Sequence, residues 1–153
     1  MDHRQAGRYW EGNAFAWTRL SRQGWDVYRD AVNTPGFLDL LPDVNGKKGL
    51  DVGCGEGHNT RLFAERGAQM FAVDVAPTFV RLAAEMERRD SDAIRYTAAS
   101  ALELPFAPQQ FDFATALMSL MDLPLPSVLN TPSLLFSALS PACALRSRKG
   151  LRN

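Results

Sequence analysis

A glycine-rich turn between a predicted strand and a predicted helix constrains the fold of this chain most. Residues 50–57 read Leu-Asp-Val-Gly-Cys-Gly-Glu-Gly, with three glycines at alternate positions between the apolar segment 49–52 and the helical pattern of 59–66. Glycine suits such a turn because it accepts positive φ and lets a ligand lie against the backbone. The helix would direct free N–H groups and a positive dipole end into the same crevice. The turn therefore predicts a site for a ligand with an anionic or carboxylate group.

Strands and helices alternate after this turn. We predict further strands at 70–73, 94–97 and 111–117, and a second helix that begins at Pro77 and ends near Arg89. In this helix the apolar side chains would face inward, namely Phe79, Val80, Leu82, Ala83 and Met86. The charged side chains would face outward, namely Glu85, Glu87, Arg88 and Arg89. This alternation predicts a parallel, doubly wound α/β sheet.

Residues 1–48 are predicted to form an N-terminal helical cap. Apolar side chains recur there at helical spacings among charges, and we expect Gly24 and the Thr-Pro-Gly segment 34–36 to break the helices. Three tryptophans fall in this cap, Trp10, Trp17 and Trp25. They either pack the cap against the domain behind it or cover a ligand pocket. In the second case the candidates for a lid are Tyr9, Trp17 and Tyr28.

Residues 124–153 differ in composition from the rest of the chain. They contain no acidic residue and four basic ones, whereas the first 122 residues hold 17 acidic and 13 basic side chains. Prolines recur in this segment, and no further strand–helix unit is visible in it. We therefore expect an atypical, disordered tail. The remaining residues, 49–123, would form the ligand-binding half-domain.

The composition of the whole chain excludes several classes of function. Lysine plus arginine equals aspartate plus glutamate, at 17 each, so nothing favours nucleic acid or an anionic membrane as a partner. Cys54 and Cys143 are too few for a disulfide framework or a zinc site. The N-terminus lacks the apolar core of a signal peptide, and no stretch of about 18 apolar residues could span a bilayer. We therefore expect a soluble, cytoplasmic protein.

An acidic residue at the end of the second predicted strand could bind the same ligand as the glycine turn. Asp74 lies 19 residues beyond Gly55, where a carboxylate can accept hydrogen bonds from both hydroxyls of a ribose. Asp74 could instead cap the helix that begins at Pro77. The dinucleotide fingerprint needs glycine or alanine where His58 stands, so a nicotinamide-dependent oxidoreductase is the less favoured alternative.

Two segments together resemble the class I S-adenosylmethionine-dependent methyltransferases. Residues 51–57 match the D/E-x-G-x-G-x-G pattern that binds S-adenosylmethionine in that family. Residues 100–106 (Ser-Ala-Leu-Glu-Leu-Pro-Phe), followed by Phe111-Asp112 and an apolar strand, are similar to the D-A-x-x-L-P-F…F-D signature of its small-molecule branch, the type found in quinone biosynthesis. The resemblance covers about residues 9–123. It implies a Rossmann-like parallel sheet, S-adenosylmethionine as the cofactor and a small molecule as the methyl acceptor.

The resemblance also implies cofactor contacts. Asp51, Gly53 and Gly55 would line the methionine end of the cofactor, with Cys54 between the glycines as a small turn residue rather than a nucleophile. Asp74 would hold the ribose. The other implied contacts are Val75 beside the adenine, Ser100 and Ala101 at its edge, and Leu117 beside the sulfonium. The family usually has aspartate where Ser100 stands, so a single hydroxyl replaces a charge-assisted acceptor.

The catalytic residues stay open in this interpretation. Methyl transfer from a sulfonium depends mainly on positioning the nucleophile and excluding water, so a dedicated base is optional. His58 is either such a base or a polar residue at a helix start. Residues 116–120 (Ala-Leu-Met-Ser-Leu) stand where an Asn-Pro-Pro-Tyr-like segment would indicate methylation of adenine or glutamine amide nitrogens.

Only the first part of the family's sheet is visible in the sequence. The family's sheet has the strand order 3-2-1-4-5-7-6, and we identify strands one to four, which predicts a chain truncated at its C-terminal end. Strand four would then be an apolar edge that is open to self-association. The chain is therefore either a methyltransferase for a small molecule or a non-catalytic fragment that retains only cofactor binding or self-association.

Overall fold

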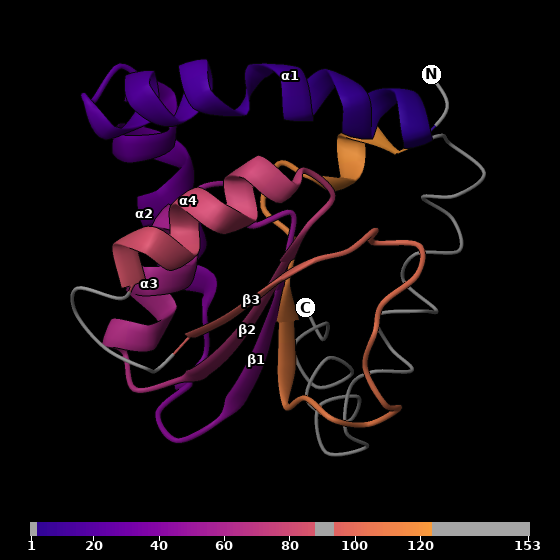
Figure 1. Ribbon diagram of the computed structural model, residues 1–153. Coiled ribbons are helices and arrows are strands. Elements are labelled where there is room, and N and C mark those ends of the chain that lie inside the picture. Colours follow the sequence, from indigo (N-terminus) through magenta and orange to yellow (C-terminus); the bar gives the residue numbers. More distant parts are fainter. Residues whose placement is uncertain (1–2, 88–93, 124–153) are drawn as a thin grey trace.

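A computed structural model of the chain contains a parallel sheet of four strands in the order β3-β2-β1-β4 (Figure 1). It describes residues 3–87 and 94–123. The strands are β1 (Lys48–Val52), β2 (Gln69–Asp74), β3 (Ile94–Ala98) and β4 (Phe113–Thr115). In the centre of the sheet, β1 pairs with β2 from Lys48↔Gln69 to Val52↔Val73. All pairs are parallel, so the carboxyl ends of the strands meet at one edge of the sheet, and the predicted α/β class is confirmed.

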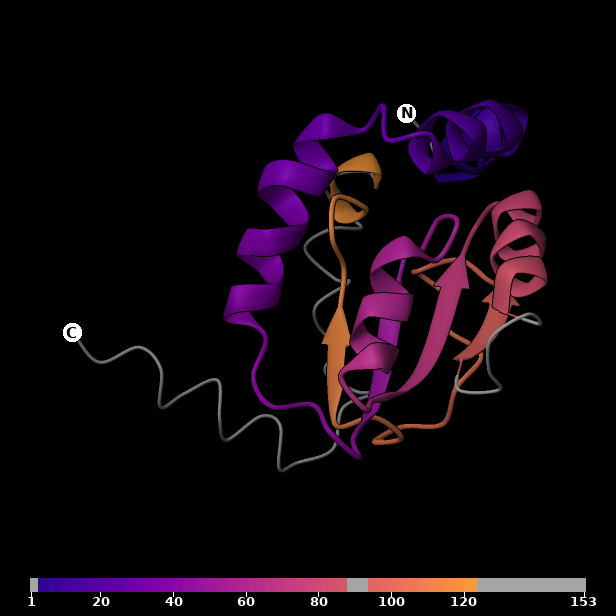
Figure 2. The same cartoon turned by 90° about the vertical axis from the view of Figure 1, so that its left-hand side faces the viewer.

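The helices surround this edge and one face of the sheet. They are α1 (His3–Arg22), α2 (Thr34–Leu40), α3 (His58–Glu65) and α4 (Pro77–Glu87). A short π-helical segment, Arg29–Asn33, runs directly into α2, and a 3₁₀ turn, Leu120–Asp122, follows β4. Figures 1 and 2 show α1 above α4, near the carboxyl ends of the strands. The predicted N-terminal helical segment is therefore present, and α1 lies near the edge where a ligand site was expected.

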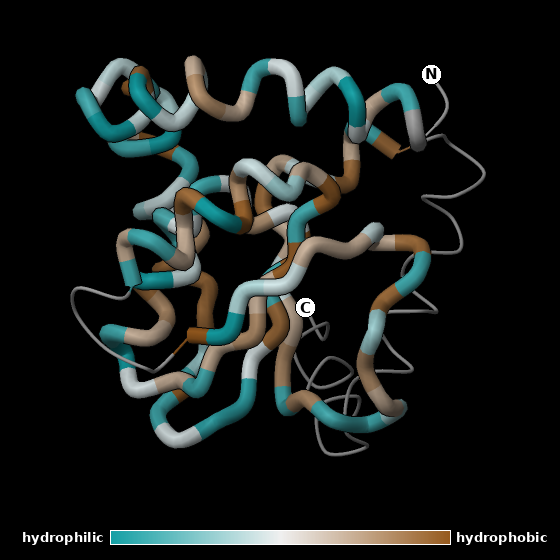
Figure 3. The backbone as a smooth tube through the Cα atoms, viewed as in Figure 1, coloured by the Kyte–Doolittle hydropathy of each residue, from teal (hydrophilic) through white to brown (hydrophobic). Residues whose placement is uncertain are grey.

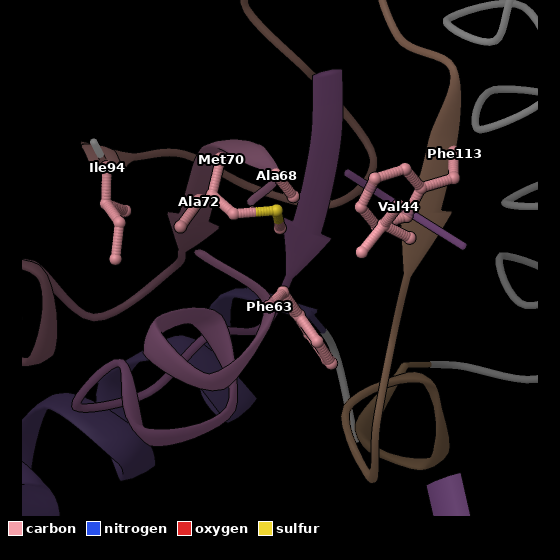
Figure 4. Close-up of a cluster of buried hydrophobic side chains, with 7 residues drawn as sticks. All are labelled: Val44, Phe63, Ala68, Met70, Ala72, Ile94 and Phe113. Carbon is pink, nitrogen blue, oxygen red and sulfur yellow. The ribbon is translucent and has the colours of Figure 1, made fainter. Parts of the chain in front are cut away.

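Apolar side chains alternate between the two faces of the sheet, as they do in pleated strands. On one face, Met70 and Ala72 of β2 pack with Phe63 of α3 (Figure 4). On the other face, Leu50, Val52 and Val73 are covered by residues of the loop after β3. Phe106 and Phe111 of this loop contact each other and Phe71 of β2 edge to face. Strands β2 and β4 thus contribute to both halves of the core, whereas β1 contributes to the second half and β3 to the first.

Helix α1 packs mainly through small side chains. Its buried residues are Ala6, Gly7, Ala14, Thr18 and Ser21. A Cβ on Gly7 would lie 3.0 Å from Val75, so the helix approaches the loop after β2 closely. Figure 3 shows hydrophilic and hydrophobic residues interleaved along α1, and its large apolar side chains are mostly exposed. The close approach therefore depends on small residues, and Trp10 is the aromatic side chain of α1 that packs inward, on Phe79.

Three details of the expected elements were wrong. The segment 34–36 does not break a helix, because α2 begins at Thr34 and accommodates Pro35 in its first turn. Glu87 is buried, only 7% exposed, although its charge placed it on the outer face of α4. The strand expected over 111–117 is β4, which covers only 113–115. After β4 the chain turns at Met118, which has a positive φ of 58°, and Ser119 then donates a hydrogen bond to the carbonyl of Val52 at the end of β1.

No helix in the described ranges, 3–87 and 94–123, is long and apolar enough to cross a membrane. The expected tail, 124–153, lies outside the described residues.

Candidate functional site

The loops at the carboxyl ends of β1 to β4 line one cavity of about 450 Å³ together with the N-terminal helical segment. Eight of the nine residues expected to bind a cofactor line this cavity: Gly53, Cys54, Gly55, Asp74, Val75, Ser100, Ala101 and Leu117. These residues come from four different loops. A cavity of this size at this edge of a parallel sheet suits a cofactor-sized ligand.

The glycine turn has the backbone that its sequence predicts. Gly53, Gly55 and Gly57 all have positive φ, at 74°, 55° and 82°. A Cβ on Gly55 would meet no atom within 4 Å, so this glycine leaves open space on the cavity side. At Gly53 the space is taken by Ser119, whose Oγ donates a hydrogen bond to the carbonyl of Val52 at 2.7 Å. The turn is therefore fixed from one side and open on the other.

Asp74 joins the glycine turn to the loop after β2. Its Oδ2 accepts a hydrogen bond from the N–H of Gly55, and its Oδ1 accepts one from the N–H of Ala76, both at 2.9 Å. Burial raises the pKa of this carboxyl, and the two amides oppose the rise. Each oxygen keeps a second lone pair for a ligand hydroxyl. Asp74 can therefore cap the segment that follows β2 and also bind a ligand in the cavity.

Asp51 is the one expected cofactor residue that does not line the cavity. Its carboxylate is 4% exposed and accepts hydrogen bonds from Thr60 Oγ1 at 2.6 Å and from Thr115 Oγ1 at 2.9 Å. Burial raises the pKa of Asp51 to about 6, against the lowering effect of these hydroxyls. The structure thus places Asp51 behind the turn, where it connects β1 to α3 and β4.

Glu56 is a residue of the site that the sequence interpretation missed. It is 4% exposed, and its carboxylate forms ion pairs with Arg22 at 3.3 Å, Arg29 at 3.6 Å and Arg61 at 3.0 Å. Ser21 adds a hydrogen bond at 3.4 Å. Three of these four partners belong to the N-terminal helical segment, so Glu56 connects that segment to the glycine turn. No local spacing indicated this, because the partners are scattered from position 21 to position 61.

The aromatic residues of the N-terminal segment divide between the two roles considered for them. Trp10 packs on Phe79 with ring centroids 6.3 Å apart, and it also lines the cavity. Trp17 and Tyr28 line the cavity too, but Tyr9 does not, so only two members of the predicted lid are in place. Trp25 is 72% exposed and does not line this cavity.

The surroundings of Cys54 and His58 favour structural roles for both side chains over roles as a nucleophile or a base. Burial, Asp74 and Asp51 raise the pKa of the Cys54 thiol, which keeps it protonated and disfavours a nucleophile. Burial and Arg29 lower the pKa of His58, whose Nε2 lies 3.9 Å from Asp30 Oδ1. Among the described residues, no group of three or more His, Cys, Asp or Glu side chains could hold a metal ion.

Sequence comparison places this site in a known family. The family model described as "Methyltransferase domain" matches residues 50–132. The ubiquinone biosynthesis O-methyltransferase of Pseudomonas fluorescens (strain SBW25) is 38% identical over 129 residues, which make up 83% of this chain and 55% of that protein. The chain thus spans about half the length of the curated relatives it matches.

Solved structures agree with the sequence match. An S-adenosylmethionine-dependent methyltransferase from Mesorhizobium loti is 27% identical, with a TM-score of 0.61 over 73% of this chain and 51% of that one. The Burkholderia thailandensis 1,6-didemethyltoxoflavin-N1-methyltransferase, solved with S-adenosylhomocysteine, has the same fold, with a TM-score of 0.65 at 23% identity over 84% of this chain and 56% of that one. The chain belongs to the class I S-adenosylmethionine-dependent methyltransferase family.

Proposed function

We propose that this protein binds S-adenosylmethionine and transfers its methyl group to a small-molecule acceptor. One observation carries the proposal: a single cavity joins the open glycine turn, the Asp74 carboxylate and the loops after β3 and β4. Each of these groups matches one part of the cofactor. The 38% identity to a ubiquinone biosynthesis O-methyltransferase supports a small organic molecule as the acceptor.

The cavity residues fit the cofactor part by part. The open side of Gly55 would admit the methionine portion against the backbone, and the Asp74 carboxylate would accept hydrogen bonds from the ribose hydroxyls. Val75 would flank the adenine, and Ser100 and Ala101 would meet its edge. The Ser100 hydroxyl accepts the Leu102 N–H at 3.2 Å and keeps one lone pair and its own O–H for the adenine.

Catalysis would then consist mainly of positioning. When bound, S-adenosylmethionine supplies a methyl group that passes to an acceptor lone pair, while the electron pair of the broken C–S bond stays on sulfur. The protein's part is to hold the acceptor in line and to keep water out. Tyr28, Met118 and Met121 are more than half exposed and line the cavity, so an acceptor with an apolar ring would cover them.

The wider properties follow from composition and topology. Residues 1–48 would act as a cap, and residues 49–123 as the cofactor-binding half-domain. Two cysteines support a cytoplasmic location, and the balanced charge supports neither nucleic acid nor a membrane as partner. Among the described residues β4 pairs only with β1, which supports self-association through its other edge.

The test is calorimetric titration of the whole chain with S-adenosylhomocysteine. We expect micromolar binding that falls at least about 10-fold in Asp74→Ala, because charge-assisted hydrogen bonds are lost. Asp39→Ala, at an exposed position away from the cavity, is the matched control and should bind like the wild type. A chain that is folded by circular dichroism and does not bind would refute the proposal. Turnover of small phenols by a binding-competent chain separates an enzyme from a non-catalytic fragment.

A further inference from the structure

Most of the charged side chains that line the cavity are neutralised by protein partners. Arg29 pairs with Glu56 at 3.6 Å and with Asp26 at 3.9 Å. The carboxylate of Asp74 binds two backbone amides. Burial and Arg29 lower the pKa of His58, which disfavours its charged form. Asp26, Arg29 and Glu56 thus compensate one another, whereas the two amides do not neutralise Asp74, whose carboxylate would face the ribose in the proposed function.

Asp122 is a second carboxylate of the cavity that has no ion pair among the described residues, and it lies on a different loop from Asp74. Its side chain has one partner in the described part of the chain, the indole N–H of Trp10, which donates to Oδ2 at 3.1 Å. No ion pair and no backbone amide is recorded there for this carboxylate, and it is half-buried. The indole donor orients the carboxylate without cancelling its charge. Asp122 therefore presents a carboxylate without a cationic partner at the wall of the cavity.

The turn that carries Asp122 is held at the glycine end of the cavity. Ser119, three residues earlier, donates a hydrogen bond to the carbonyl of Val52 and lies against Gly53. Leu117, which would lie beside the sulfonium in the proposed function, begins the same loop. The carboxylate thus belongs to the loop that would border the reacting part of the cofactor.

We propose that Asp122, oriented by Trp10, is the counter-charge of the sulfonium and makes the cavity prefer S-adenosylmethionine to S-adenosylhomocysteine. This inference rests on the proposed function. The two ligands share every group except the methyl, and only the methylated one carries a positive charge on sulfur. A carboxylate without a cationic partner attracts the sulfonium and gains nothing from a neutral thioether. Loss of the charge on transfer would also loosen the product.

The test measures both ligands on the same variants. In Asp122→Asn we expect the affinity for S-adenosylmethionine to fall about five-fold, the size of a partly solvated ion pair, with the affinity for S-adenosylhomocysteine changed less than about two-fold. Asp122→Glu, which keeps the charge, should preserve most of the preference. Asp39→Asn makes the same charge change away from the cavity and should alter neither affinity.

Salt gives a second measurement that needs no variant. In the wild type, raising the ionic strength from about 0.01 M to 1 M should reduce the preference for S-adenosylmethionine, because screening weakens the attraction. Equal effects of Asp122→Asn on both ligands, or a preference insensitive to salt, would overturn the inference while the proposed function stands. A folded wild type that binds neither ligand would overturn both.

Discussion

Gly53 is the position where one added methyl group should damage the site most. Its φ is 74°, and a Cβ there would overlap the Cβ of Ser119 and lie 2.8 Å from its Oγ. Alanine in the left-handed region costs about 1 kcal/mol, and displacement of Ser119 would lose its hydrogen bond to Val52, about 1 kcal/mol more. We therefore expect Gly53→Ala to lower the free energy of unfolding by about 2–3 kcal/mol, measured by urea denaturation.

Gly24 provides the matched control for this substitution. Its φ is 78°, nearly the same, but a Cβ there would meet no atom within 4 Å. Gly24→Ala should therefore cost only the backbone strain, about 1 kcal/mol. Ser119→Gly, which removes the opposing Cβ, should restore part of the stability in the Gly53→Ala background. Equal losses in the two alanine variants, within about 0.5 kcal/mol, would refute the steric reasoning.

Two further predictions concern the buried carboxylates. Because the pKa of Asp51 is raised to about 6, the folded chain binds its proton more readily than the unfolded chain, so this group's contribution to stability falls as pH rises from about 4 to 6. Asp51→Asn should remove that loss. If the urea midpoint changes between pH 4.5 and pH 7 by the same amount in the wild type and in Asp51→Asn, the reasoning is contradicted. Glu56→Gln should lower the free energy of unfolding by about 2 kcal/mol, because three arginines lose a nearly buried partner. Glu85→Gln, in an exposed pair with Arg81, should cost less than about 0.5 kcal/mol; a loss as large as that of Glu56→Gln would show that burial is not the reason.

The sequence predicted the parts of the molecule that depend on local patterns. The glycine turn directly follows β1, and Asp74 is the last residue of β2, so each lies next to the strand that positions it. Strand periodicity located β1, β2 and β3 to within one residue at each end. Eight of nine expected cofactor residues reached the cavity because the carboxyl ends of parallel strands share one edge.

Contacts between distant parts of the chain could not be predicted in this way. The hydrogen bond from Trp10 to Asp122 joins residues 112 positions apart, and the partners of Glu56 come from three separate elements. Asp51 was assigned to the ligand from its motif, but Thr60 and Thr115 converge on it only when α3 and β4 are in place. Side-chain chemistry alone also misplaced Glu87, since charge argues for exposure unless a partner is known.

The small buried face of α1 has a thermodynamic consequence. Polar contacts hold this helix to remote segments: Glu11 accepts hydrogen bonds from the N–H and Oγ1 of Thr78, Trp10 donates to Asp122, and Arg22 pairs with Glu56. Lifting α1 off the cavity would break these contacts and expose one limited apolar cluster, formed by Ala14, Ala76, Phe79 and Trp10. The heat-capacity change of opening would therefore be small, because that quantity scales with apolar exposure. The equilibrium between open and covered cavity should accordingly follow a nearly linear van 't Hoff plot.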